Sequence, residues 1–193
     1  MTGILGGTFD PPHIGHLILA EEAGVRFSLE RVLLVPSRLP PHKMNGHLTP
    51  FEDRLEMLAL AVSGNPRLEV ADLEAGAGPS YTIDLLRRAR AEGIDPVFIT
   101  GSDSLSEMPS WKDYPLFLDL ARFVAGKRAG CGEPVIPPAA AGRVEIFEIP
   151  GILVSSSAVR ERFARSMPTR YLIPESVRRF ITERGLYGFR EGR

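Results

Sequence analysis

Short apolar runs alternate with longer amphipathic stretches along this chain, and this alternation restricts the fold more than any other feature. The runs at residues 31–36, 96–100 and 144–149 have the length and composition of buried strands. Between them, apolar residues recur at helical spacing, as at residues 14–27 and 50–62. Strands and helices in alternation are typical of βα units around a parallel sheet. The sequence therefore predicts an α/β fold with a single core.

Glycine, proline and capping residues mark the ends of the other elements. One helix start is especially clear, because Thr49 stands in the N-cap position, Pro50 at the first helical position and Glu52 three residues after the cap. Two helices are expected at the end of the chain, from near Ser157 and from Pro174. The remaining expected elements are strands at residues 2–5, 68–72 and 121–126 and a helix at residues 82–92, with residues 126–142 left as a loop.

Composition excludes several classes of protein. The 193 residues suffice for one domain with a buried core, and 44% hydrophobic with 24% charged residues are ordinary globular values. A net charge of -1 gives no electrostatic reason to expect a nucleic-acid or membrane partner. The single cysteine, Cys131, excludes an intramolecular disulfide. No signal-peptide pattern and no run of about 18 apolar residues occurs, so we expect a cytoplasmic protein.

The stretch GGTFDPPHIGH, from Gly6 to His16, carries the clearest chemical signal. Gly6 and Gly7 allow a tight turn and a close approach to a ligand directly after an expected strand. The helix behind the proline pair offers unpaired N–H groups and the positive end of its dipole. Neither GxxxxGK[ST] nor GxGxxG occurs, so the stretch is neither a P-loop nor a dinucleotide fingerprint. Its composition nevertheless predicts a phosphate site.

His13 and His16 stand three residues apart, so both imidazoles lie on one face of the first helical turn. In this context we expect them to bind the same phosphate chain. Without the context, such a pair reads as two capping or packing histidines. A zinc site would need a third ligand, and His42 and His47 lie in another loop with no HExxH motif in the chain. We therefore predict no metal ligands.

A second motif, VSSSAVRERF, lies near the other end of the chain. Its serines precede an expected helix, and Arg160 follows one turn later. Taken alone, the serines read as a helix cap and Arg160 as a solvated surface charge. About 140 residues separate this motif from the first one.

The two motifs together resemble the HxGH and ISSTxIR signatures of the nucleotidylyltransferase superfamily, which bind the triphosphate of ATP or CTP. HIGH is also the signature of class I aminoacyl-tRNA synthetases, but this chain is too short and has no KMSKS-like loop. The resemblance implies a Rossmann-like, doubly wound, mostly parallel sheet with C-terminal helices. It also implies one nucleotidylyltransferase domain over residues 1–193, in which residues 155–193 form the helical part that carries SSSxxR.

Four shorter pieces narrow the family: PPHK from Pro40, PSYT from Pro79, GSD from Gly101 and PSW from Pro109. With the C-terminal segment YLIPESVRRFITERGLY, they resemble bacterial nicotinate-mononucleotide adenylyltransferases over essentially the whole chain. GSD departs from the usual GAD or GQD but keeps the aspartate, and Ser157 replaces the usual threonine but keeps the hydroxyl.

The resemblance assigns roles to particular residues. It makes His13, His16 and Arg160 catalytic. It implies that Gly6, Gly7, Thr8, Phe9, His13, His16, Gly101, Asp103, Ser156, Ser157 and Arg160 bind ATP. It implies that His42, Lys43, Tyr81, Thr82 and Trp111 bind the second substrate.

The substrate residues also fit a pyridine carboxylate chemically. Trp111 can stack on the ring, and the Thr82 hydroxyl can donate to the carboxylate. Other interpretations stay open for single positions. Trp111 alone reads as a core residue, Tyr81 as packing or ligand contact equally, and Asp103 as a turn residue.

The implied reaction is transfer of AMP from ATP to nicotinate mononucleotide, which yields nicotinate adenine dinucleotide and pyrophosphate. Mg²⁺ is expected to arrive with ATP, without a dedicated protein ligand. The alternatives are pantetheine-phosphate adenylyltransferase or another nucleotidylyltransferase, and, from a different class, a non-catalytic nucleotide-binding regulator. The oligomeric state is left open, a homo-oligomer included.

Overall fold

The computed structural model describes residues 1–41, 48–74 and 78–188. One six-stranded sheet has the order β3-β2-β1-β4-β5-β6, and every neighbouring pair is parallel. This confirms the expected Rossmann-like α/β fold. The strands are β1 (Thr2–Gly7), β2 (Arg31–Pro36), β3 (Leu68–Val70), β4 (Pro96–Gly101), β5 (Arg122–Arg128) and β6 (Val144–Ile149).

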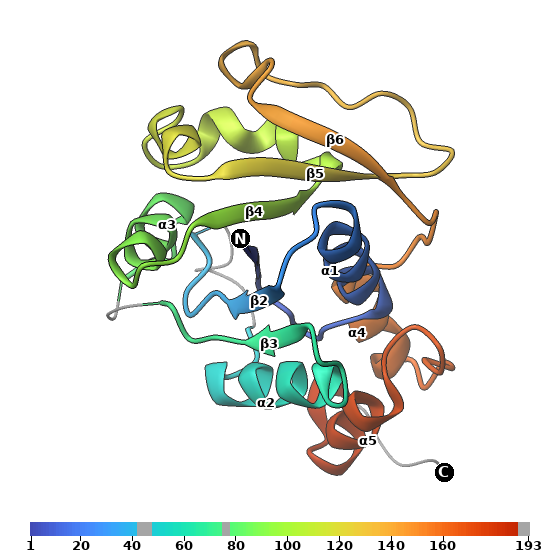
Figure 1. Cartoon of the computed structure of the whole chain (residues 1–193). Helices are drawn as coiled ribbons and strands as arrows, with labels where there is room; N and C mark the ends of the chain where they lie inside the picture. Colours follow the sequence, from blue (N-terminus) through green and yellow to red (C-terminus); the bar gives the residue numbers. More distant parts are fainter. Residues whose placement is uncertain (42–47, 75–77, 189–193) are drawn as a thin grey trace.

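Helices cover both faces of the sheet, because each strand sends alternate apolar side chains to opposite sides. Leu5 and Leu34 pack with α1 and α2, whereas Ile4 and Leu33 pack with α3 and the short 3₁₀ segments. Figure 1 shows α1 and α3 on opposite sides of the sheet. The helices are α1 (Ile14–Arg26), α2 (Phe51–Val62), α3 (Thr82–Ala91), α4 (Ser156–Ala164) and α5 (Glu175–Glu183), with 3₁₀ segments η2 (Ser102–Ser110), η3 (Leu116–Asp119), η4 (Pro138–Ala140) and η5 (Leu186–Gly188).

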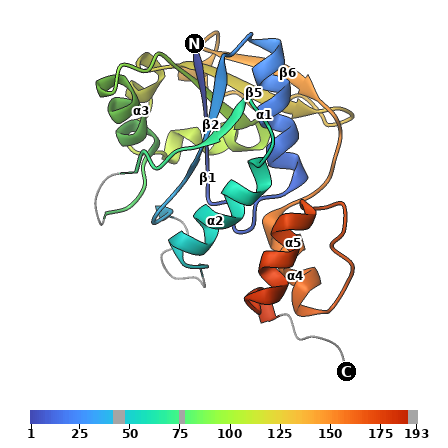
Figure 2. The same cartoon turned by 60° about the horizontal axis from the view of Figure 1, so that its bottom comes forward.

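The two C-terminal helices pack against α2 and form a small apolar cluster of their own. Met57 of α2, Phe163 of α4 and Ile181 of α5 are all buried in it. Figure 2 shows α4 and α5 side by side beyond α2. This packing brings the C-terminal segment to the loop that follows β1.

The strand order creates a crevice at the carboxyl ends of β1 and β4. The chain moves from β1 outward to β2 and β3, and then crosses back to β4 on the other side of β1. At such a reversal the loops after the two central strands diverge, which leaves room for a ligand. The GGTFDPPHIGH loop follows β1 and the GSD segment follows β4.

Some sequence expectations need correction. Thr49 is not the N-cap of α2, since the cap position is Pro50 and no side chain caps the helix. The main-chain oxygen of Thr49 instead accepts a hydrogen bond from Arg54 Nε at 2.9 Å. β5 continues to Arg128, past the expected end at residue 126, and the 3₁₀ segments were not anticipated. Among the described residues, no helix combines the length and the apolar character needed to cross a bilayer.

Candidate active site

Two cavities adjoin at the carboxyl ends of β1 and β4. The imidazole cavity, of about 270 Å³, includes His13, His16 and Arg128 in its lining. The aromatic cavity, of about 260 Å³, includes Tyr81 and Trp111. The residues that line both cavities are Gly6, Thr100 and Ser104.

The two histidines stack at the start of α1, as their spacing predicts. Their ring centroids lie 3.6 Å apart with the planes at 16°. The main-chain N–H of His13 donates to Nδ1 of His16 at 3.2 Å, which holds the His16 ring. The buried ring of Phe9 meets His16 edge-on with a centroid distance of 4.9 Å. The loop and the helix start together fix the direction in which both imidazoles face.

His13 is neutral at physiological pH. Burial, with the nearby positive charge of Arg128, lowers the pKa of His13 from 6.5 to about 4. Arg128 lies at the end of β5 and pairs with Asp103 through a distance of 2.9 Å between Nη1 and Oδ2. The cavity therefore offers N–H donors and a guanidinium, which are the groups that bind phosphate oxygens.

The low pKa of His13 predicts that acid destabilises the fold. At pH 7.5 the imidazole is almost entirely neutral in both the folded and the unfolded chain, because the pKa is about 4 in the folded chain and 6.5 in the unfolded one. As the pH falls, the unfolded chain takes up the proton first, so the free energy of unfolding should drop by about 2 kcal/mol at pH 5. Urea unfolding at pH 7.5 and pH 5 measures this loss. A His13→Asn variant cannot titrate at this position and should lose less; equal losses in both proteins would contradict the assignment.

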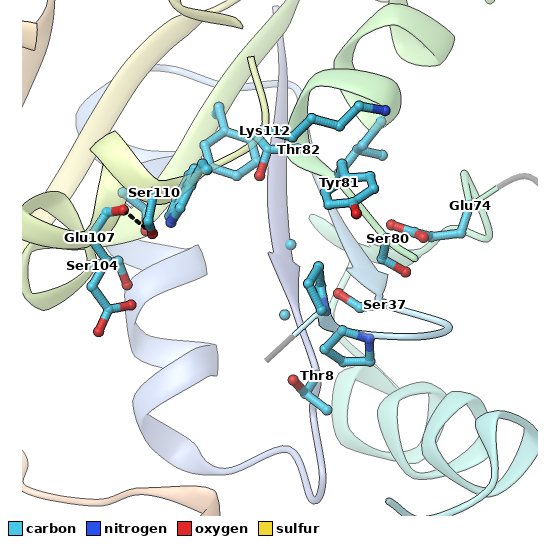
Figure 3. Close-up of a pocket in the computed structure, with 18 residues that line it drawn as sticks. Thr8, Ser37, Glu74, Ser80, Tyr81, Thr82, Ser104, Glu107, Ser110 and Lys112 are labelled. Atoms are coloured by element: carbon cyan, nitrogen blue, oxygen red, sulfur yellow. Dashed lines mark hydrogen bonds between the residues drawn. The ribbon is translucent and has the colours of Figure 1, made fainter. Parts of the chain in front are cut away.

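The aromatic cavity combines ring surfaces with hydroxyl groups. Figure 3 shows Thr82 and Lys112 at one end of it and Thr8 at the other. Lys112 Nζ lies 4.5 Å from the centroid of the Tyr81 ring and bonds to Asp84 Oδ2 at 2.9 Å. This ion pair links the segment that follows η2 to α3. Tyr81 and Lys112 both line the aromatic cavity, so a cation lies beside the ring at the cavity wall.

Trp111 has a double role in the packing. Its ring is partly buried against the core, with a centroid 5.6 Å from that of Phe117 and 6.4 Å from that of Phe98. It also lines the aromatic cavity together with Thr82. The ring of Trp111 therefore packs against the core and also forms part of the wall of the aromatic cavity.

Acidic groups occur in the aromatic cavity as well. Burial raises the pKa of Glu74, and hydrogen bonds from the Ser80 hydroxyl and the main chain of Arg38 oppose this shift. Ser80 Oγ also accepts a hydrogen bond from the Leu39 N–H at 3.1 Å. On the far side, the Ser110 hydroxyl donates to the main-chain oxygen of Glu107 at 2.7 Å (Figure 3).

The residues predicted to bind ATP fall into three groups. Some line the imidazole cavity: Gly6, His13, His16, Gly101 and Asp103. Gly7 and Thr8 line the aromatic cavity instead. Four line neither cavity: Phe9, Ser156, Ser157 and Arg160.

Ser156 and Arg160 contact the loop of the first motif, between β1 and α1. The Ser156 hydroxyl donates to the main-chain oxygen of Pro11 at 2.9 Å, and Arg160 Nη1 donates to that of Asp10 at 2.7 Å. Arg160 Nη2 lies 3.4 Å from the Ser157 hydroxyl. The second motif is thus brought to the first across 150 residues of sequence.

All three predicted substrate residues in the described part of the chain line the aromatic cavity: Tyr81, Thr82 and Trp111. His42 and Lys43 lie outside the described residues. Sequence reasoning missed Arg128 and Lys112. Arg128 could have been found from its place at the carboxyl end of a strand beside the crevice, whereas Lys112 carries no such signal.

The side chains that line the imidazole cavity determine whether the protein itself could bind a magnesium ion there. Mg²⁺ prefers oxygen ligands. The acidic residue lining the imidazole cavity is Asp103, and its carboxylate is paired with Arg128. No group of three His, Cys, Asp or Glu side chains in the described ranges could hold a metal ion. The polar groups that line the imidazole cavity are thus mainly N–H donors and one guanidinium, and not the oxygen ligands that a bare Mg²⁺ prefers.

Comparisons with known proteins place the chain in a family. Residues 4–162 match the model of the cytidylyltransferase-like family. A protein of Geobacillus thermodenitrificans named "Probable nicotinate-nucleotide adenylyltransferase" is 44% identical over 97% of this chain and 86% of its own length. A protein of the same name from Geobacillus kaustophilus is 43% identical over 98% of this chain and 87% of its own length.

Solved structures agree on the fold. Plasmodium falciparum nicotinic acid mononucleotide adenylyltransferase, in a structure complexed with NaAD, superposes with a TM-score of 0.78 at 21% identity and covers 98% of both chains. The same enzyme complexed with APC gives a TM-score of 0.77 at 20% identity, also over 98% of both chains. The chain therefore belongs to the cytidylyltransferase-like family and, within it, to the nicotinate-nucleotide adenylyltransferases.

Proposed function

We propose that this protein transfers the adenylyl group of ATP to nicotinate mononucleotide in the two adjoining cavities. An oxygen of the mononucleotide phosphate bonds to the α-phosphorus of ATP. The bond from that phosphorus to the oxygen bridging to the β-phosphate breaks, and its electron pair leaves with pyrophosphate. The other product is nicotinate adenine dinucleotide.

The observation that carries this proposal is the meeting of two unlike cavities at Gly6. The imidazole cavity offers donors for a polyphosphate, and the aromatic cavity offers rings and hydroxyls for a pyridine nucleotide. Because Gly6 lines both, the two phosphates can approach each other over a backbone without a side chain. In-line attack needs this proximity of the reacting groups.

The residues of the imidazole cavity would act by positioning and by stabilising charge. The attacking phosphate is already anionic at neutral pH, so no strong base is required. His16, the neutral His13 and Arg128 would donate to phosphate oxygens as negative charge shifts towards pyrophosphate. Mg²⁺ bound to the ATP phosphates would neutralise part of that charge. Asp103, paired with Arg128, would hold the guanidinium in place.

Thr82 and Lys112 of the aromatic cavity favour the acid over the amide of the pyridine substrate. A carboxylate only accepts hydrogen bonds, and the Thr82 hydroxyl can donate one, whereas the hydroxyls of Ser80 and Ser110 already donate to Glu74 and to the main-chain oxygen of Glu107. Lys112 adds a positive charge at the end where Thr82 lies (Figure 3). An amide would bring donors of its own to the same groups.

Pyrophosphate release from ATP and Mg²⁺ tests the function directly. Nicotinate mononucleotide, nicotinamide mononucleotide and phosphopantetheine are offered in parallel. We expect the highest kcat/KM with the nicotinate compound. Preference for phosphopantetheine would keep the reaction class and refute the substrate, and no turnover with any of them would favour the binding-only regulator.

Replacing Trp111 tests the aromatic cavity. Trp111→Ala should raise the KM for nicotinate mononucleotide about tenfold, because the pyridine ring loses its stacking surface. The KM for ATP should change little, since Trp111 does not line the imidazole cavity. Trp111→Phe retains an aromatic face and serves as the matched control, with most of the affinity kept. Equal rises in both KM values, or a full loss in the Phe variant, would contradict the pocket role.

A further inference from the structure

The C-terminal segment contacts the loop between β1 and α1 through a third residue, Tyr187, which belongs to neither sequence motif. The Tyr187 hydroxyl donates to Asp10 Oδ1 at 2.7 Å, across 177 residues of sequence. Its neighbours at this junction are Ser156 and Arg160, which bind main-chain oxygens of the same loop. Tyr187 therefore binds a side chain of this loop, whereas Ser156 and Arg160 bind its main chain.

The carboxylate of Asp10 lies in a buried junction. Only 2% of Asp10 is exposed, although a carboxylate is costly to bury without partners. The positive charge of the fully buried Arg54 lies close enough to interact with it. Burial raises the pKa of Tyr187 far above its ordinary value, with Asp10 as the next cause, so its hydroxyl keeps the proton and donates.

Two residues of this junction have a backbone conformation that bulky side chains rarely adopt. Phe9 has φ 50° and Tyr187 has φ 59°, both in the left-handed region. Such conformations persist where the surroundings hold them, and they cluster at functional sites. Phe9 directly precedes Asp10, and its ring forms a T-shaped contact with His16 at a centroid distance of 4.9 Å. A continuous path of contacts thus runs from Tyr187 through Asp10 and Phe9 to His16.

We infer that Tyr187 is a positioning residue for adenylyl transfer: its hydroxyl, bound to the buried Asp10 carboxylate, fixes the turn that places Phe9 against His16. This inference rests on the proposed function for its kinetic consequence. Tyr187 lines neither cavity and its hydroxyl is bound to Asp10, so we expect it to contact neither substrate directly. Its removal should therefore lower kcat and leave both KM values almost unchanged.

Tyr187→Phe removes one oxygen atom and keeps the ring. We expect kcat to fall about tenfold, because a small displacement of His16 reduces the fraction of complexes in reactive geometry. Tyr171→Phe is the matched control: Tyr171 is also a C-terminal tyrosine with positive φ, but it is 81% exposed. A Tyr187→Phe enzyme with the kcat of Tyr171→Phe would overturn the inference.

The route through Asp10 is tested by a double-mutant cycle. In an Asp10→Ala background the acceptor is already gone, so Tyr187→Phe should lower kcat less than about twofold. A full tenfold loss in that background would show that Tyr187 acts by another route and would overturn the inference. The comparison with Tyr171→Phe decides the question even where Asp10→Ala does not fold.

Hydrogen–deuterium exchange separates this inference from the proposed function. Peptides that cover residues 8–16 should exchange faster in Tyr187→Phe than in the unmutated protein, and not in Tyr171→Phe. A wild-type protein that makes no nicotinate adenine dinucleotide would refute the proposed function, and the exchange result would still decide whether Tyr187 fixes the loop. Unchanged exchange over residues 8–16 would overturn the positioning role.

Discussion

His16→Ala should lower kcat by about 10²- to 10³-fold, the largest kinetic effect expected of a single substitution in this protein. The loss corresponds to about 3 to 4 kcal/mol of transition-state stabilisation, the range found when one preorganised donor is removed from a charge-stabilising site. The His16 ring lines the imidazole cavity and is held by the His13 N–H, the stacked His13 ring and the edge of Phe9. Steady-state kinetics with ATP and nicotinate mononucleotide measures the effect.

Two conservative variants separate the chemistry of His16 from its structural role. Asparagine can place an acceptor where Nδ1 receives the His13 N–H, but it has no atom at the position of Nε2. Glutamine reaches further and can place a donor near that position. His16→Asn should therefore keep the thermal stability and lose the rate, and His16→Gln should retain more activity. Near-normal turnover in folded His16→Ala would remove the phosphate-binding role.

The architecture could be predicted from the sequence because its elements are amphipathic and well separated. The six strands and five helices occur at the expected places, since each strand is a short apolar run and each helix has an apolar face that packs on the sheet or, for α4 and α5, on α2. The segment from Ser102 to Asp119 was not predicted as structured. Its 3₁₀ turns have too few residues to show a periodicity, and its core side chains, Leu105 and Phe117, read as isolated apolar residues.

Site residues that lie close together in the sequence could be predicted to meet. Residues whose partners are distant in the sequence could not. His13 and His16 share one helical turn, so their spacing alone indicates that they meet. Arg54 stands in an amphipathic helix, where a charged residue normally faces solvent, yet it is fully buried. Its partners are main-chain oxygens of distant loops, and every residue type has such an oxygen. The sequence therefore contains no pattern that would pair them with Arg54.

Arg54→Met should reduce the free energy of unfolding by about 3 to 5 kcal/mol, the range expected when a buried, fully bonded charge is removed. Methionine keeps the length and apolar volume of the side chain but has no donors. The guanidinium donates to the main-chain oxygen of Ser37 at 2.7 Å and to that of Thr8 at 2.9 Å. It also donates to those of Thr49 at 2.9 Å and Arg38 at 3.1 Å. Four partly buried acceptors would lose their partner, each at a cost in desolvation.

Urea unfolding of Arg54→Met is best compared with that of Arg88→Met. Arg88 also lies on a helix, but it forms an exposed ion pair with Glu92 at 3.0 Å, a type of pair that contributes about 0.3 to 0.5 kcal/mol. A similar loss in both variants would mean that the bonds of Arg54 add little to stability. The main-chain oxygens of Thr8 and Ser37 belong to loops that line the aromatic cavity. The larger loss expected for Arg54→Met should therefore be accompanied by a higher KM for nicotinate mononucleotide, because the same bonds that stabilise the fold hold the Thr8 and Ser37 loops at one end of that cavity.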